Sequence, residues 1–277
     1  MLEREEYVEQ AYFFHVLGER MTQNMSTQDL LVSVREELLA TTRLPMAVDF
    51  LCSELRLTGV FATAMARLSH YFTPFQTFVV AQAERERGRF DFTIALQILE
   101  HEAAYRADGA TPQGAFLYQF ECLCRNRLGY DKGLEAVAAD PIYNSDWRDW
   151  ILTVRRQVGI VEIADLIYVR SQHYVNNRQR QGLDRDGPEK PVLFGEQEGK
   201  IALANRQREP LLLFSALERH LHYPKVPRPK PVDESKLLLP GLLRRMDRLE
   251  ARIKLLEEEQ KGGIDLTRFL GESPPEP

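Results

Sequence analysis

Three short clusters along the chain combine residue types that could perform acid–base or metal chemistry. The first is Glu-His-Glu at positions 100–102, where a histidine between two carboxylates could transfer a proton or bind a divalent metal. Cys122 and Cys124 form the second cluster, and His220 and His222 form the third. Closely spaced thiolates and imidazoles occur in zinc sites, so the element that carries each cluster decides its chemistry.

The secondary structure predicted around these clusters argues against that chemistry. All three lie in segments with helical periodicity, where neighbouring side chains point about 100° apart. Positions 100–102 therefore cannot converge on one proton or metal, and we interpret them as a solvated helix face. The cysteines diverge, which excludes a disulfide or zinc pair between them, and a His-x-His pair chelates from a strand rather than a helix. We expect no catalytic residue, no cofactor and no metal.

Sequence motifs of the common enzyme classes are also missing. The chain has no His-Glu-x-x-His zinc motif, phosphate-binding loop, dinucleotide-binding fingerprint or nucleophile elbow. The sequence therefore predicts a non-enzymatic protein. An enzyme whose site lies between two helical blocks and is assembled from distant residues is the third-ranked alternative.

Trp147 and Trp150 are three positions apart, beside Ile151 and Val154 on one predicted helix face. Such a face favours burial between two helices. The alternative is a groove that docks a partner protein, because tryptophans are enriched at binding hot spots. We therefore keep both tryptophans as candidate partner-docking residues.

Arg155 and Arg156, and further along Arg178 and Arg180, make two locally basic segments. They suggest a regulatory protein that binds nucleic acid or another anion, which is the second-ranked function. No aromatic residues alternate with these arginines, and the whole chain carries a net charge of -5, so neither feature is a strong nucleic-acid signature.

The composition of the 277-residue chain is that of a folded protein, with 44% hydrophobic and 28% charged residues. No apolar run approaches the roughly 18 residues that span a bilayer, and the acidic N-terminal sequence lacks the layout of a signal peptide. The three cysteines fit a reducing compartment. We expect a cytoplasmic protein that does not insert into membranes.

Helical periodicity dominates the chain, and no segment alternates as a strand would, so the predicted fold class is all-α. Residues 1–107 are predicted to form an N-terminal six-helix bundle. Its helices are expected at 3–21, 26–42, 45–59, 59–69, 73–88 and from 91 to about 105, with Thr73 as a cap before Pro74.

A second helical block is predicted over residues 108–222. It begins with Thr111 capping a helix that opens on Pro112, and Ser145 or Asp146 is expected to cap a later helix. Residues 176–190 are polar and contain glycine, which indicates a loop, and Pro210 is expected to split the last two helices.

Residues 223–236 carry four prolines and are predicted to form an extended linker. The linker precedes one helix at 237–261 and a tail at 262–277, which we expect to be disordered in isolation. The helix has apolar residues at alternating spacings of four and three, the pattern of a two-stranded coiled coil: Leu242, Met246, Leu249, Ile253 and Leu256. We expect homo-oligomerisation through this face.

The tail carries an apolar cluster whose members include Leu266, Phe269 and Leu270. Apolar residues in an otherwise polar tail are typical of docking peptides, while an inert tail is the alternative. We list these three residues as candidate partner-docking residues.

Residues 66–88, ARLSHYFTPFQTFVVAQAERERG, combine a small-residue helix, a phenylalanine and a proline. Together with FFHVLGERMTQN before them and FDFTIALQILEHEAAY after them, they resemble the cytoplasmic domain of platform proteins of type II secretion and type IV pilus systems, the F family. The resemblance covers about residues 12–107. It departs from the family because the chain has neither its transmembrane helices nor a second copy of the domain.

The resemblance implies a compact six-helix unit that recruits other proteins. In such a unit Tyr71, Phe72, Phe75 and Phe78 would form the inner face of the fifth helix and the turn into it. The first-ranked function is therefore a non-enzymatic cytoplasmic scaffold or adaptor for protein–protein interaction. A secretion or pilus-like machine is implied as its partner by the resemblance alone.

The coiled-coil hypothesis makes a direct prediction about assembly. The combined change Leu249→Asp and Ile253→Asp places charges in the apolar seam, where they can be neither solvated nor paired. The variant should run as a monomer in light scattering while the wild type runs as a homodimer or higher oligomer. A wild-type chain that is already monomeric at tens of micromolar would contradict this assignment.

Overall fold

The computed structural model of the chain describes residues 2–21, 26–85, 90–182 and 190–228, and then Met246, 248–250 and Ile253. Residues Met1–Pro229 form one compact unit, and Lys230–Pro277 form a second. The described residues are helical, with isolated bridges instead of a sheet. The predicted all-α class is confirmed.

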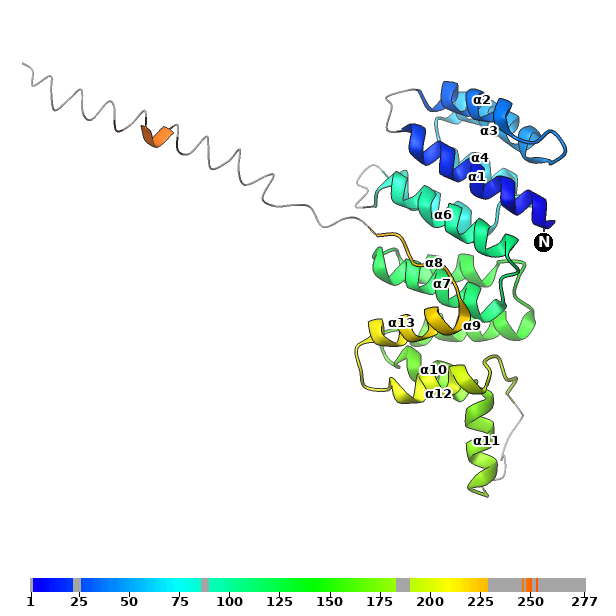
Figure 1. The fold of residues 1–277 in the computed structure, drawn as a ribbon, viewed down its shortest axis with the longest axis vertical. Coiled ribbons are helices and arrows are strands. Elements are labelled where there is room, and N and C mark those ends of the chain that lie inside the picture. Colours follow the sequence, from blue (N-terminus) through cyan, green and yellow to red (C-terminus); the bar gives the residue numbers. More distant parts are fainter. Residues whose placement is uncertain are drawn as a thin grey trace, which may run out of the picture. The chain divides into compact units, whose positions relative to one another are not determined.

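The first six helices occupy the N-terminal part of the larger unit. The main contacts pair α1 with α6, α2 with α3 and α4 with α5, and the helices follow one another in layers (Figure 1). The bounds are α1 Arg4–Arg20, α2 Thr27–Glu37, α3 Leu44–Thr58, α4 Phe61–Arg67, α5 Pro74–Ala83 and α6 Phe92–Ala107.

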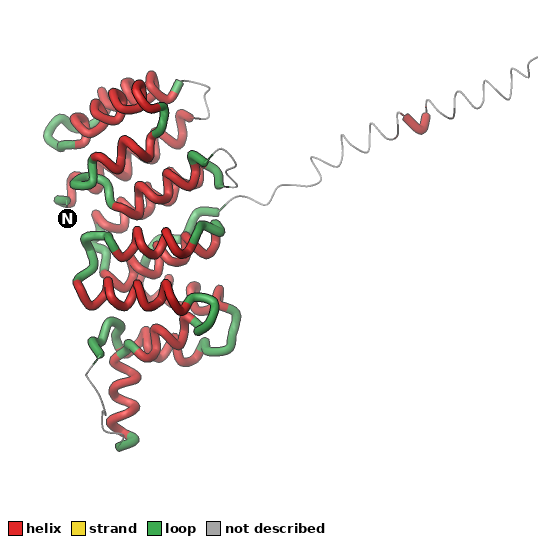
Figure 2. The backbone as a smooth tube through the Cα atoms, turned by 180° about the vertical axis from the view of Figure 1, so that it is seen from behind, coloured by secondary structure: helices red, strands yellow, loops and turns green. Residues whose placement is uncertain are grey.

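The remaining helices of the larger unit continue the same layered arrangement, except α11, which extends away from the layers (Figures 1 and 2). Their bounds are α7 Pro112–Arg125, α8 Tyr130–Ala138, α9 Ser145–Gln157, α10 Ile163–Val169, α11 Gln172–Arg180, α12 Glu196–Ala204 and α13 Pro210–Leu221. Residues 172–180 are therefore helical, and the loop predicted from residue 176 begins too early.

Local caps explain many of the helix ends. Thr73 and Gln76 form a reciprocal capping box in front of Pro74, and the Thr111 side chain accepts a hydrogen bond from the backbone N–H of Gly114. The cap of α9 is Asn144 rather than the predicted Ser145 or Asp146, because its side chain accepts from the N–H of Trp147.

Two helices end earlier than predicted because distant carboxylates bind the backbone. Glu9 accepts from the N–H of Leu39 at 3.0 Å, and Glu6 accepts from the N–H of Arg43 at 2.9 Å, which stabilises the non-helical segment after α2. Glu84 similarly follows α5 and accepts from the first two N–H groups of α4, at 2.6 and 2.8 Å. Charge-assisted hydrogen bonds of this kind are stronger than those between neutral groups.

The aromatic residues of the fifth helix and the turn before it are buried, as predicted. Phe72 and Phe75 are almost fully enclosed, and Tyr71 donates from its hydroxyl to Glu6 at 2.8 Å. The Phe72 ring lies 6.3 Å from the ring of Phe14 on α1. Burial explains the dense aromatic run before the charged segment.

The two predicted blocks share an interface inside one compact unit. Helix α5 packs on α8, α6 packs on α7, and the Tyr118 hydroxyl of α7 donates to the Ile98 carbonyl of α6 at 2.9 Å. Whether residues 1–107 fold without the second block stays a prediction.

The predicted linker is wrong over its first residues. Tyr223 is buried and donates from its hydroxyl to Glu121 at 2.9 Å, while Asn126 donates to the Pro227 carbonyl at 3.1 Å. Residues 223–228 are extended, as the prolines indicated, but they belong to the larger unit as a strap across α6 and α7. The rest of the predicted linker lies outside the described residues.

In the smaller unit, Met246, Leu249 and Ile253 are helical and exposed by 56, 59 and 54%. These exposures leave the predicted coiled-coil face available, whereas Leu242 and Leu256 lie outside the described residues. Among the described residues, no helix has both the length and the apolar character needed to cross a bilayer.

The aromatic core makes a prediction about stability. Replacing Phe72 by alanine should lower the free energy of unfolding by about 3–5 kcal/mol, since it removes a fully buried ring and leaves a cavity. Met46→Ala is the control, because Met46 is 69% exposed and its loss should change stability by less than about 0.5 kcal/mol. Equal denaturation midpoints for the two variants would contradict the assigned core.

Candidate functional site

The Glu-His-Glu cluster at 100–102 lies on α6, and its three side chains have different surroundings. Glu100 lies 3.0 Å from the His15 ring nitrogen, His101 lies 3.1 Å from the Lys225 carbonyl, and Glu102 is buried. The predicted divergence is correct, but the predicted solvated face is wrong for Glu102. Its burial was missed because Gln119, which donates to it, and Asp140, which shares Arg106 with it, lie far along the sequence.

Glu102 belongs to a buried polar network around Arg106. The Arg106 guanidinium donates to Glu102 at 2.9 Å and also to Asp140. Gln119 donates to the same two carboxylates at 2.8 and 3.0 Å, and accepts from the Tyr143 hydroxyl at 2.8 Å. The network thus joins α6, α7 and the turn between α8 and α9.

The charges in this network stabilise one another. Burial opposes the charge of Arg106, but the two carboxylates outweigh it and raise the pKa of the guanidinium well above its ordinary value. Within the described protein, Arg106 Nε, Arg106 Nη1 and Glu102 Oε2 have no hydrogen-bond partner. Because all three side chains are shielded from solvent, we interpret the network as a structural clasp between the blocks.

The cysteine pair lies on α7, and the histidine pair lies at the end of α13. Burial raises the pKa of the Cys122 thiol well above its usual range, and burial raises that of Cys124 to about 11. His220 lies 3.3 Å from Glu198, whereas His222 ends α13 in a left-handed conformation. In the described part of the chain, no three potential metal ligands lie together.

Trp147 and Trp150 lie in the core of the second block. The Trp150 ring lies 4.7 Å from that of Phe116 on α7, and both tryptophan rings lie 5.2 Å from Phe194. This burial agrees with the core interpretation and leaves neither ring open to a partner. The other candidate docking residues, Leu266, Phe269 and Leu270, lie outside the described residues.

The four arginines of the basic segments lie on two helices. On α9, Arg155 pairs with Asp131 at 2.6 Å and Arg156 donates to Thr153 at 3.3 Å. On α11, Arg178 donates to the Tyr174 hydroxyl at 3.2 Å, and Arg180 is exposed near the helix end.

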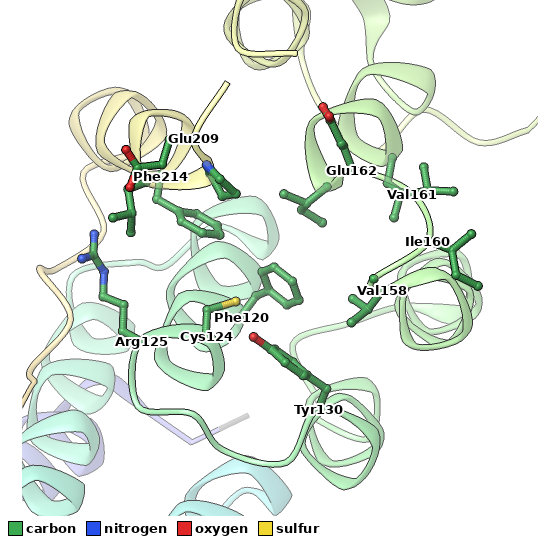
Figure 3. Close-up of a pocket in the computed structure, with 15 residues that line it drawn as sticks. Phe120, Cys124, Arg125, Tyr130, Val158, Ile160, Val161, Glu162, Glu209 and Phe214 are labelled. Carbon is green, nitrogen blue, oxygen red and sulfur yellow. The ribbon is translucent and has the colours of Figure 1, made fainter. Parts of the chain in front are cut away.

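An apolar groove of about 560 Å³ lies between α7, α8, α10 and α13 (Figure 3). Its aromatic floor consists of Phe120, Tyr130 and Phe214, with ring centroids of Phe120 at 6.3 Å from Tyr130 and 6.1 Å from Phe214. Leu211 on α13 and Ile160 in the turn before α10 form opposite parts of the wall.

The turn between α9 and α10 places Ile160 at the edge of the groove. Gly159 adopts a φ of 86°, a conformation that glycine tolerates best, and Val158 bridges to Val161 across the turn. The turn leaves Ile160 83% exposed. A large aliphatic side chain held in water at the rim of an apolar groove indicates a surface that something covers.

Two of the charged residues that line the groove, Arg125 and Glu162, are engaged with other groups, and Glu209 is exposed at its edge. Arg125 pairs with Glu121, and Glu162 accepts from the backbone N–H of Gln207 at 2.9 Å. Cys124 is a weak nucleophile because its thiol is protonated at neutral pH, and burial raises the pKa of the Tyr130 hydroxyl to about 12. The lining of the groove is therefore mostly apolar, with the Cys124 thiol and the Tyr130 hydroxyl both protonated at neutral pH.

Sequence reasoning missed this groove because its lining comes from four separate segments of the chain. The run of four apolar residues 211–214 at the start of α13 was one available sign, because four consecutive positions extend all the way round a helix and exceed a single apolar stripe. Leu213 and Phe214 are buried, whereas Leu211 and Leu212 are 41 and 52% exposed.

No family model, curated protein or solved structure matches this chain. The resemblance of residues 12–107 to secretion and pilus platform domains therefore stays a prediction, and the function is argued from the geometry.

The Arg106 network gives a stability prediction. Arg106→Met should lower the free energy of unfolding by about 3–5 kcal/mol, because it leaves Glu102 and Asp140 buried without their cation. Arg155→Met is the control, since it removes an arginine from an exposed ion pair and should leave stability unchanged within error. If urea denaturation gives the two variants the same stability, the clasp assignment is wrong.

Proposed function

We propose that this protein is a non-enzymatic scaffold whose apolar groove binds an amphipathic helix of another protein. The observation that carries the proposal is the exposure of Ile160 beside the aromatic floor of Phe120, Tyr130 and Phe214. Grooves of this kind recognise the apolar face of a helix through large side chains at positions i, i+3 or i+4, and i+7.

A helix fits this surface better than a small ligand does. A small apolar molecule would fill the floor but leave much of Ile160 and Leu211 in water, and these are 83 and 41% exposed. A helix about 10 Å wide can cover the floor and both rims together. The aromatic floor residues would then act as the hot spot.

Assembly through the C-terminal helix is the second part of the proposal. Its support is the exposed apolar face of Met246, Leu249 and Ile253, which needs a covering partner. Self-association would present several grooves at once and strengthen binding to a multivalent partner.

The cellular location of the scaffold and the source of its partner are each proposed from one observation. A cytoplasmic location is supported by the three cysteines, all of which are free thiols. A secretion or pilus-like assembly is proposed as the source of the partner on the resemblance of residues 12–107 alone.

The test is a selection from a displayed library of 16-residue helical peptides with the full chain as bait. Enriched peptides should carry large apolar residues at helical spacing. A labelled enriched peptide should bind at least tenfold more weakly to Ile160→Asp, because the new carboxylate would be desolvated at the rim.

Leu57→Asp is the matched control, since Leu57 on α3 is 80% exposed and lies outside the groove. It should bind the peptide like the wild type. Failure to enrich any peptide, or equal loss of binding in both variants, would contradict the proposed groove.

A further inference from the structure

Helix α11 is not part of the hydrophobic core. None of its residues from Gln172 to Arg180 is buried, although every other helix of the larger unit has buried residues. It contacts α10 and α12 and extends away from the layered helices (Figures 1 and 2). Core packing therefore does not explain why these residues are held as a helix.

The base of α11 is nevertheless fixed by several contacts. Ser171 is fully buried, accepts from the N–H of Tyr174 at 3.2 Å and donates to the Tyr168 carbonyl at 2.7 Å. The Phe194 carbonyl accepts from the N–H of Gln172 at 2.9 Å. Gly199 of α12 allows this approach, because a Cβ there would lie 2.3 Å from the Ser171 Oγ.

The first turn of α11 is also tied to α12. His173 lies 2.8 Å from one Glu196 oxygen, and Asn176 donates to the other at 2.7 Å. The helix is thus a rigid projection with a fixed direction. Preorganisation of this kind lowers the entropic cost of binding a partner.

The side chains of α11 are those that read nucleic acids. Residues 172–180 contain two arginines, Arg178 and Arg180, and no aspartate or glutamate. Gln172, Gln179 and Arg180 are exposed. Amide side chains pair with adenine edges and guanidinium groups with guanine edges in the major groove of DNA.

The short turn between α10 and α11 and the amide side chains of α11 point to a duplex rather than to an acidic protein. Helix α10 ends at Val169 and α11 begins at Gln172, so a short turn joins a packed helix to a projecting one. Such a pair can place its second helix in the major groove, which admits one α-helix. An acidic protein would use the arginines and leave the amides unengaged.

The Arg178 guanidinium is held beside α11 by Tyr174, to whose hydroxyl its Nη1 donates at 3.2 Å. The guanidinium lies 5.8 Å from the Tyr174 ring centroid, and the Arg178 Nε is shielded without a hydrogen-bond partner within the described protein. Stacking on the ring holds the cation near the helix without neutralising it.

We infer that α11 is a DNA-reading helix and that it binds the major groove of double-stranded DNA. Gln172, Gln179 and Arg180 face the bases, and Arg178 contacts the backbone. This site shares no residue with the apolar groove. The inference therefore does not depend on the proposed scaffold function.

The experiment uses the full chain and a labelled 30-base-pair duplex pool with a randomised centre. Repeated selection at about 100 mM salt should enrich particular sequences, and binding to the enriched duplex should weaken as salt rises. Arg180→Gln should reduce affinity about tenfold, and Gln179→Ala should reduce the preference for the enriched sequence over the pool.

Arg156→Gln is the matched control, because it also removes one exposed arginine charge but lies on α9. It should bind like the wild type. Circular dichroism should be unchanged in every variant, since α11 has no buried residue.

Three results would overturn the inference. One is the absence of binding to any duplex at about 50 mM salt. Another is equal binding to heparin or duplex RNA, because the A-form major groove does not admit a helix. The third is equal weakening by Arg180→Gln and Arg156→Gln.

Discussion

The buried pairing of Arg106 with Glu102 and Asp140 is the constraint on which the arrangement of the second block depends. Removing three charged side chains from water is costly unless they meet in good geometry. Asp140 follows α8 and the other two residues lie on α6, so their meeting brings the turn between α8 and α9 against the first block. Gln119 of α7 also donates to Asp140, so α7 is joined to the same network.

The apolar groove follows from that arrangement. With α8 packed on α5 and α7, Tyr130 at the start of α8 lies near Phe120, and α9 leads into the Gly159 turn that exposes Ile160. The opposite wall is α13, where the Tyr223 hydroxyl joins Glu121 of α7 to the Phe214 carbonyl of α13. The strap and the clasp thus fix the two walls of the groove from opposite ends of the block.

Sequence reasoning succeeded where local chemistry decides and failed where distant partners decide. Thr73 before Pro74 and Thr111 before Pro112 mark helix starts by their own side chains, so both could be predicted. The end of α2 could not, because it depends on Glu6 and Glu9 of another helix. The docked strap was missed for the same reason: its prolines indicate an extended chain but not the partners of Tyr223.

Helix α11 is more regular in the structure than its sequence predicted. Its polar sequence resembles a loop, and an isolated helix of nine residues is marginal in water. The helix is held by contacts at its first turn, where Ser171 is buried and Glu196 binds His173 and Asn176. These contacts stabilise a helix that buries none of its own side chains. They therefore fix the direction of α11 and do not enlarge the hydrophobic core. A protein that needed only a connection between α10 and α12 could use a flexible loop, whereas a rigid polar projection is what recognition of a shaped polar surface requires.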